Sequence, residues 1–265
     1  MSYPQGPGYY KAEPAYAARL KAAGLVDGMS VFELPQIEVW RSITERENCV
    51  LDTTDENGAT TRFHIKRNKP GHRGVDDEAA KIKLLIDHGV PTVPLAGYGK
   101  LHDGRGFLIT DDLAGYQDAE KIVAADKSAF EKLLKPTAAL AAKLHGQNLH
   151  HRDLYLCHFY VRTTDKTGDN GLDVRLMDAG RVGVLPRLFR RRWLVKDIAQ
   201  FGFSLTQLEL PADVFERWLA EYGSLPGTTI DTAFRRSVAR KMRWIARHDA
   251  SLRRRQPTRN VAIDR

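Results

Sequence analysis

Residues 149–161 constrain the fold of this chain more than any other segment. They place His151, Arg152 and Asp153 in succession, and His158 follows five positions after Asp153. The surrounding sequence predicts a helix before this stretch and a strand after it, so the polar residues should share one short loop. Such a loop suits phosphoryl transfer, which needs a carboxylate at the incoming hydroxyl and a second polar group near the metal. A three-residue match is weak by itself, and an ordinary polar loop would also explain it.

The first part of the chain predicts a small β-rich lobe. Residues 1–10 are rich in Pro, Gly and Tyr and are expected to form a loose tail. A helix should begin at Glu13, with Pro14 in its first turn, and end at Gly24. β-branched and aromatic residues predict strands at 38–43, 48–52, 60–66, 93–100 and 106–110, a hairpin turn at 55–58, and one helix from about 76 to 88.

The second part predicts a larger helical lobe. Residues 111–115 have the composition of a hinge, which divides the chain into an N-terminal lobe at 1–110 and a C-terminal lobe at 116–265. Helical segments are expected at 126–149 with a kink at Pro136, then at 195–205, 212–222 and 229–254. Short strands ending near 162 and at 173–177 should flank a turn at 167–171. The fold class is therefore α+β with two lobes.

Four residues now stand in an informative order: Lys66 on a strand, Glu78 on the next helix, Asp153 on the loop, and Asp178 in an Asp-x-Gly at a strand end. This order resembles the protein-kinase-like fold and covers most of the chain. Residues 151–158 read His-Arg-Asp-Leu-Tyr-Leu-Cys-His, which is similar to the loop of the lipopolysaccharide core kinases. Those enzymes phosphorylate inner-core heptose or Kdo sugars, and residues 110–114 and 78–90 resemble the same family.

The resemblance implies an ATP site. Lys66 would anchor the α- and β-phosphates of ATP, with Glu78 as its ion-pair partner. The main-chain groups of Asp111 and Leu113 would hold adenine, with Thr110 behind it. The plain alternatives are a solvated strand lysine for Lys66 and, for Glu78, an acid that the dipole of its helix favours.

The resemblance also implies the reacting groups. Asp153 would accept or orient the proton of the attacking hydroxyl, and Asp178 would bind the Mg²⁺, or alternatively Mn²⁺, that bridges the nucleotide phosphates. His158 occupies the position of a metal-binding Asn in protein kinases. Because magnesium prefers oxygen ligands, His158 could instead contact a phosphate or a metal-bound water.

Three neighbours of the loop have supporting roles in this interpretation. His151 is expected to be structural and to pack under the loop. Arg152 is expected to pair with a carboxylate. Asp197 resembles the buried helix Asp that braces the catalytic loop, although a first-turn acid is the plain alternative.

One departure concerns the phosphates. Residues 42–47 stand where protein kinases have a glycine-rich loop, and they contain no glycine. Backbone clasping of phosphates should therefore be weaker or differently shaped. A catalytically silent pseudokinase that acts as a binding module remains an alternative.

The charge predicts an anionic partner. The formal net charge is +8, which suits a nucleic acid, an acidic membrane surface or an anionic sugar. Arg190, Arg191 and Arg192 are expected to bind an anionic glycan such as the lipopolysaccharide core. Residues 179–196 contain no Ser, Thr or Tyr, so phosphorylation of this segment cannot switch the protein.

Compartment and rival functions complete the predictions. Cys49 and Cys157 form no disulfide framework, and neither a signal peptide nor an apolar run of about 20 residues is visible, so a cytoplasmic location is expected. Peripheral contact with the inner membrane stays open. The rivals are a protein Ser/Thr/Tyr kinase, the pseudokinase, and a nucleic-acid binder. The last would use a basic C-terminal helix but is disfavoured because no recognition motif accompanies that helix. Its basic residues are Arg235, Arg236, Arg240, Lys241, Arg243, Arg247, Arg253, Arg254 and Arg255.

Overall fold

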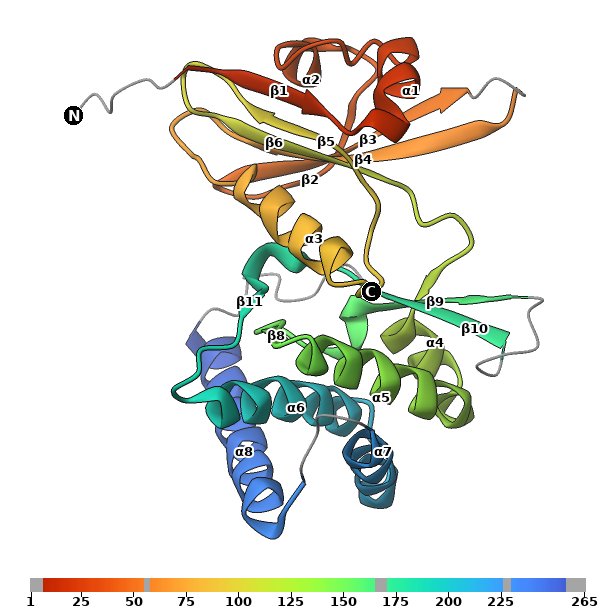
Figure 1. Cartoon of the computed structure of the whole chain (residues 1–265), viewed down its shortest axis with the longest axis vertical. Helices are drawn as coiled ribbons and strands as arrows, with labels where there is room; N and C mark the ends of the chain where they lie inside the picture. The colour runs from red at the N-terminus through yellow and green to blue at the C-terminus, as the bar shows by residue number, and fades with distance from the viewer. Residues whose placement is uncertain (1–6, 55–57, 165–170, 226–229, 256–265) are drawn as a thin grey trace. The chain divides into compact units, whose positions relative to one another are not determined.

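The computed structural model describes residues 7–54, 58–164, 171–225 and 230–255. The chain divides into two compact units (Figure 1). Residues 1–87 and 92–114 make the N-terminal unit, and residues 88–91 and 115–265 make the C-terminal unit.

An antiparallel sheet forms the N-terminal unit. Its strand order is β1-β5-β6-β4-β3-β2. The strands are β1 (Tyr9–Ala12), β2 (Glu38–Ser42), β3 (Arg46–Thr54), β4 (Thr60–Asn68), β5 (Leu95–Lys100) and β6 (Gly106–Asp111). The helices are η1 (Pro14–Tyr16), α1 (Ala17–Ala22), α2 (Ser30–Glu33) and α3 (Asp77–Asp87). Figure 1 shows α1 and α2 on one face of the sheet and α3 on the other.

The core of this unit follows from alternation along the strands. Successive side chains of a strand point to opposite faces, so Phe63 and Ile65 of β4 are buried together, and Phe107 and Ile109 of β6 join them in one cluster. The interleaved residues of β4, including Lys66, point to the opposite face. The alternation that fills the core thus also sets the direction of Lys66.

The predicted strands and the helix at 76–88 are confirmed, with shifted ends. The helix predicted from Glu13 to Gly24 is instead the 3₁₀ turn η1 followed by α1, and α2 was not predicted.

The N-terminal tail also differs. Tyr9 and Tyr10 belong to β1 and pair with β5, so the predicted loose tail is wrong at these positions. Their rings supply the reason: the Tyr9 hydroxyl donates to Asp76 at 3.0 Å, and Tyr10 stacks on Phe107 with ring centres 5.9 Å apart. Residues 1–6 and most of the predicted turn at 55–58 lie outside the described residues.

Helices dominate the C-terminal unit. They are α4 (Ala119–Ala125), η2 (Lys127–Ala129), α5 (Phe130–Gly146), η3 (Leu156–His158), η5 (Ala179–Arg181), α6 (Arg190–Gln207), α7 (Ala212–Ser224) and α8 (Thr232–Arg255). Strands β10 (Leu172–Leu176), β9 (Phe159–Thr163) and β7 (Gln117–Asp118) form one small sheet, and β11 (Gly183–Val184) pairs with β8 (Leu149–His150). The aromatic core is built on Trp218, which stacks on Phe201 and on Tyr222. The ring centres of these two pairs are 4.1 and 5.6 Å apart.

Two helix predictions for this unit need correction. The segment 126–149 is not one helix, because Asp126 caps the short η2 through its bond to the Ser128 amide, and α5 begins only at Phe130. Helix α6 begins at Arg190, five residues before the predicted start at Val195. Arg190, Arg191 and Arg192 thus form its first turn. Most of the predicted turn at 167–171 lies outside the described residues. Within the part of the chain that the structure describes, no helix is long and apolar enough to cross a bilayer.

Candidate active site

The predicted ion pair is present in the N-terminal unit. The Lys66 ammonium donates to both carboxylate oxygens of Glu78, at 2.9 and 3.0 Å. The Glu78 side chain is only 9% exposed, so this charge-assisted contact is shielded from water. The pairing of Lys66 with Glu78 is confirmed, while their contact with ATP stays a prediction.

Asp111, in the segment predicted to hold adenine, is already bonded to residues of other segments. The Asp111 amide donates to the Pro94 carbonyl at 2.9 Å, and the Asp111 carboxylate accepts from Arg19 at 2.5 Å. A main-chain contact from Asp111 to adenine would therefore use its carbonyl. Leu113 is half-buried, and the role of both residues stays a prediction.

The glycine-free connection between β2 and β3 is a tight turn. The Ile43 amide donates to the Arg46 carbonyl at 3.0 Å, and the Glu45 carbonyl accepts from the Lys69 amide at 3.1 Å. These two backbone groups are committed to the turn. The remaining groups offer a smaller clasp than a glycine-rich loop would.

Asp197 braces the loop of the C-terminal unit, as predicted. Its carboxylate accepts from the backbone amides of His151 and Arg152 at 2.7 and 2.8 Å, and it lies 3.3 Å from Nε2 of His145. Burial alone would raise the pKa of Asp197, but His145, through its hydrogen bond and its charge, and His151, through its charge and its amide, hold that pKa below its usual value. Arg152 has a positive φ of 71°, a strained conformation that persists only where surrounding bonds impose it.

Asp153 is held by side chains from two other segments. Its Oδ1 accepts from Arg181 at 3.1 Å and from Gln200 at 3.3 Å. The Lys196 ammonium donates to the carbonyl of Arg152, next to Asp153, at 2.5 Å. Both named bonds use Oδ1, which leaves Oδ2 as the oxygen that could face an incoming hydroxyl.

Sequence reasoning missed Arg181, Lys196 and Gln200. A signal was present for Gln200, which follows Asp197 by three positions. Residues three apart share a helix face. An Asp predicted to brace the loop therefore marks its helical neighbour Gln200 as another residue within reach of that loop.

His158 faces Asp178. Its Nδ1 lies 2.6 Å from the Asp153 carbonyl oxygen, which can only accept, so Nδ1 is the donor. In the neutral ring, Nε2 then carries the lone pair, and it lies 3.8 Å from Oδ2 of Asp178. The two residues predicted at the metal are thus brought together by the structure.

His151 links the loop to the residue before Asp178, and its predicted structural role fits this position. The ring is fully buried, and Nε2 donates to the Met177 carbonyl at 3.0 Å. Burial is the main reason why the pKa of His151 is lowered. A neutral His151 therefore helps to fix Asp178, whose own φ is 54°.

The fit to a metal ion is partial. Mg²⁺ typically takes one or two carboxylates and completes its octahedron with water and phosphate oxygens, and the carboxylate of Asp178 suits that use. Among the described residues, no group of three or more His, Cys, Asp or Glu side chains could hold a metal by itself. An ion here would depend on nucleotide phosphates for part of its coordination.

The arginines differ from one another. Arg152 has no carboxylate partner among the described residues, contrary to expectation, and its guanidinium lies 4.8 Å from the ring centre of Trp193. Arg190 donates to the His145 carbonyl at 3.0 Å. Arg191 makes two hydrogen bonds to Asp231, at 3.0 and 2.6 Å. The exposed Arg192 makes no ion pair with a described carboxylate. Acceptor binding by Arg190–Arg192 stays a prediction.

The chain matches known proteins in sequence. The family model described as "Lipopolysaccharide kinase (Kdo/WaaP) family" matches residues 39–222. The lipopolysaccharide core heptose(I) kinase WaaP of Escherichia coli strain K12 is 27% identical over 163 residues, which are 58% of this chain and 61% of the relative. The protein of the same name from Pseudomonas aeruginosa PAO1 is 25% identical over 164 residues, and the match covers 58% of this chain and 60% of that relative. The chain thus matches about three fifths of the length of these curated relatives.

It also matches a solved structure described as "WaaP in complex with acyl carrier protein". The TM-score is 0.66 at 22% identity, and the match covers 92% of this chain and 99% of that chain. At this identity the likeness supports the fold. The predicted two-lobed α+β, protein-kinase-like fold is therefore confirmed.

Proposed function

Because the chain belongs to the lipopolysaccharide kinase (Kdo/WaaP) family, we propose that it is an ATP-dependent phosphotransferase acting on a sugar hydroxyl of the lipopolysaccharide inner core. The observation that carries the proposal is the loop around Asp153, fixed from below by Asp197 and from the side by Arg181 and Gln200. The relatives are named core heptose(I) kinases, which favours heptose over Kdo as the acceptor.

Each residue has a defined task in this proposal. Lys66, held by Glu78, contacts the α- and β-phosphates of ATP, and the main chain at Asp111 and Leu113 holds adenine. Asp153 orients the acceptor hydroxyl with Oδ2 and receives its proton.

The metal site is assigned to the facing pair. Asp178 supplies a carboxylate oxygen, and His158 presents Nε2 toward the same place, to a phosphate or to a metal-bound water. Bound Mg²⁺, or Mn²⁺ as the alternative, neutralises charge on the phosphates. The protein then contributes positioning and fixed charge, which supply most of the catalysis in phosphoryl transfer.

We place the enzyme in the cytoplasm with peripheral contact at the inner membrane. Support comes from the segment just before α6, where Leu188 is 76% exposed and Phe189 is 72% exposed. Arg187 precedes them, and basic residues beside exposed apolar ones suit an anionic lipid surface.

A transfer assay tests the proposal. Purified protein is incubated with ATP, Mg²⁺ or Mn²⁺, and a panel of dephosphorylated core saccharides, and phosphate gain is followed by mass spectrometry. We expect transfer to a heptose-containing saccharide, slowed by about 10²-fold or more in Asp153→Asn.

Two rivals predict different results in the same assay. Efficient phosphorylation of peptides but not of saccharides would establish the protein-kinase alternative. Nucleotide binding with no transfer to any acceptor would establish the pseudokinase.

A further inference from the structure

A concave, positively charged site lies within the C-terminal unit. We call it the basic hollow; its volume is about 770 Å³, and it is lined by residues of α6 and α8, by Phe189, by Arg152 of the loop and by Arg181 of η5. Seven of its twelve lining residues are arginine or lysine, and none is an acid. The seven are Arg152, Arg181, Arg191, Arg192, Lys196, Arg240 and Lys241. The volume lies within the range of about 300–1,000 Å³ that suits small-molecule ligands.

Most of this charge is not neutralised by the protein. Arg181 pairs with Asp153, and Arg191 pairs with Asp231. The other five basic residues of the hollow make no ion pair with any carboxylate in the described part of the chain. Cations gathered in a concave site without acids attract an anion.

Aromatic rings contact three of the unpaired cations, and one of these is Lys196, whose ammonium lies 5.8 Å from the ring centre of Trp193. The Lys241 ammonium lies 3.5 Å from the ring centre of Trp244, and the Arg152 guanidinium lies 4.8 Å from that of Trp193. A cation–π contact orients a cation but, unlike a carboxylate, does not cancel its charge. The hollow therefore keeps its charge available and fixes part of it in position.

Burial and nearby positive charges lower the pKa of both lysines of the hollow. Burial, followed by the nearby Arg192, lowers the pKa of Lys241. Burial also lowers the pKa of Lys196, and Arg181 and Arg152 add to the effect although Asp153 opposes it. A bound anion would relieve this repulsion.

The hollow adjoins Asp153. Arg181 lines it and contacts Oδ1 of Asp153 at 3.1 Å, and Lys196 lines it and contacts the carbonyl of Arg152. A ligand in the hollow would therefore lie beside the direct partners of Asp153. This adjacency suits a sugar with an acidic group at one end and a reactive hydroxyl at the other.

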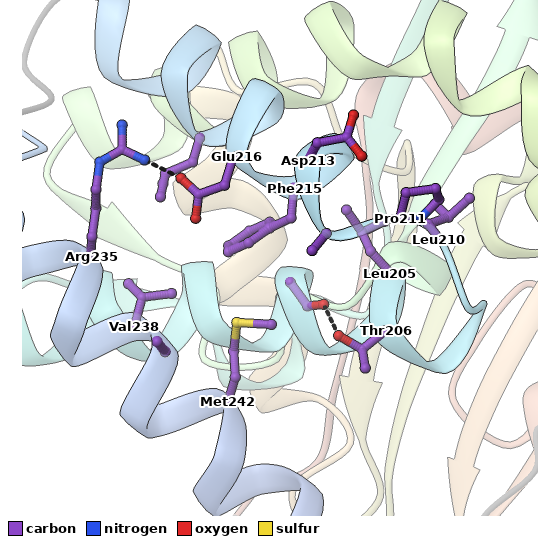
Figure 2. Close-up of a pocket in the computed structure, with 14 residues that line it drawn as sticks. Leu205, Thr206, Leu210, Pro211, Asp213, Phe215, Glu216, Arg235, Val238 and Met242 are labelled. Atoms are coloured by element: carbon purple, nitrogen blue, oxygen red, sulfur yellow. Dashed lines mark hydrogen bonds and ion pairs between the residues drawn. The ribbon is translucent and has the colours of Figure 1, made fainter.

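A neighbouring cavity shows the contrast. A cavity of about 310 Å³ lies among α6, α7 and α8, and Figure 2 shows the side chains that line it. Apolar side chains such as Phe215 and Met242 line much of it, and its one arginine, Arg235, is paired with Glu216. Helices α6 and α8 thus line both sites, but only the hollow beside Asp153 offers unpaired cations.

We propose that the basic hollow is the subsite for the carboxylate or phosphate group of the acceptor saccharide, with Arg192, Arg240 and Lys241 as its main contacts. This inference rests on the proposed function, and it names residues of α8 that the sequence interpretation did not assign to the acceptor. Anion binding in the hollow places the reactive hydroxyl of the sugar toward Asp153.

Direct binding tests the inference without turnover. The probes are deacylated core oligosaccharide, its dephosphorylated form, and its carboxyl-reduced form, titrated into the full chain by calorimetry without ATP. The variant is Arg240→Gln with Lys241→Gln. The matched control is Arg236→Gln with Arg243→Gln, which removes the same charge from α8 at exposed positions outside the hollow.

We expect the first variant to bind the intact oligosaccharide about tenfold more weakly or worse, the scale for losing a hydrogen bond to a charged group. The control should bind nearly as wild type does. If dephosphorylation weakens wild-type binding, the acidic group is a phosphate. If carboxyl reduction weakens it, the group is a carboxylate. Equal binding of all three probes, no binding by wild type, or equal loss in both variants would overturn the inference, as would displacement of the oligosaccharide by a single-stranded oligonucleotide at lower concentration.

Transfer assays run in parallel separate this inference from the proposed function. Saccharide phosphorylation with the same acceptor KM in wild type and the Arg240/Lys241 variant would overturn the hollow and leave the proposed function standing. Hollow-dependent binding with no phosphate transfer would support the hollow and count against the kinase.

Discussion

The two units fix their functional charges differently. In the N-terminal unit, the ammonium of Lys66 on β4 donates to both carboxylate oxygens of Glu78 on α3, which packs against a face of the sheet. In the C-terminal unit, Asp153 and Asp178 depend on groups beneath them, where Asp197 holds the loop amides and His151 holds the strand end.

In the N-terminal unit the backbone at the functional residue does not depend on the functional contact. In the C-terminal unit the groups that hold the functional residues also stabilise the fold. Lys66 sits on a regular strand, so its backbone conformation needs no support from the ion pair. Arg152 and Asp178 both have positive φ values, 71° and 54°, and such residues cost about 1–3 kcal/mol each. The buried network offsets that cost, so changes to it should affect folding as well as catalysis.

The largest expected effect comes from the reacting carboxylate. Asp153→Asn should leave folding and nucleotide binding nearly intact and lower turnover by about 10²-fold or more, the scale for a positioned acid–base group. The measurement is steady-state transfer to a core saccharide. A variant as fast as wild type would remove Asp153 from the chemistry.

The next largest effect tests whether the stability of the C-terminal unit depends on the bonds that hold the loop. Asp197→Asn removes a fully buried charge and leaves a loop amide facing an NH₂ group, so the free energy of unfolding should fall by about 3 kcal/mol. Turnover should fall with it. Urea unfolding followed by tryptophan fluorescence measures the change, since three of the four tryptophans, Trp193, Trp218 and Trp244, lie in the C-terminal unit and only Trp40 lies in the N-terminal unit. The exposed Asp213→Asn is the control and should change the free energy of unfolding by less than about 0.5 kcal/mol. Equal stability of Asp197→Asn and wild type would break the comparison.

In the N-terminal unit, the loss of the functional contact should not affect the folding of the C-terminal unit. Lys66→Met should weaken binding of a non-hydrolysable ATP analogue by about tenfold or more, because a charge-assisted contact to phosphate is lost. The urea midpoint of the C-terminal unit should not move. Calorimetry measures the affinity, and the exposed Lys21→Met should bind as wild type does. Loss of C-terminal stability in Lys66→Met would show that the two units are not independent in this respect.

The sequence was sufficient where chemistry and spacing coincide. The strand alternation placed Lys66 opposite the core, the first turn of α3 placed Glu78, and the loop motif with Asp197 predicted a brace that the structure contains. These features depend on neighbours in sequence or on motif order.

What was missed depends on contacts between distant segments. Arg181 reaches Asp153 from a short 3₁₀ turn, and Tyr9 joins the sheet through bonds to β5 and Asp76. The start of α6 was also missed, because three consecutive arginines carry no apolar periodicity. In the structure, Arg190 and Arg191 are held by bonds to the His145 carbonyl and to Asp231, which are distant in sequence.

The smallest expected effect is a pH dependence confined to the C-terminal unit. The pKa of buried His151 is lowered relative to the unfolded chain, chiefly by burial. The unfolded state therefore takes up a proton on this ring more readily than the folded state does. The stabilisation is fully present above the unfolded pKa of about 6.5 and is lost as the pH falls below it. The free energy of unfolding should decline as the pH falls below about 6.5, with a slope of at most about 1.4 kcal/mol per pH unit for one such group.

His150 complicates the measurement, since burial lowers its pKa too. His151→Gln can still donate to the Met177 carbonyl but does not titrate, so the decline should become shallower without vanishing. Urea unfolding at several pH values, followed by tryptophan fluorescence, gives both slopes. Identical slopes in wild type and His151→Gln would mean that the buried ring does not couple protonation to folding. In that case the C-terminal unit would link its folding to its active-site loop through Asp197 and its hydrogen bonds to that loop, and His151 would have no part in that link.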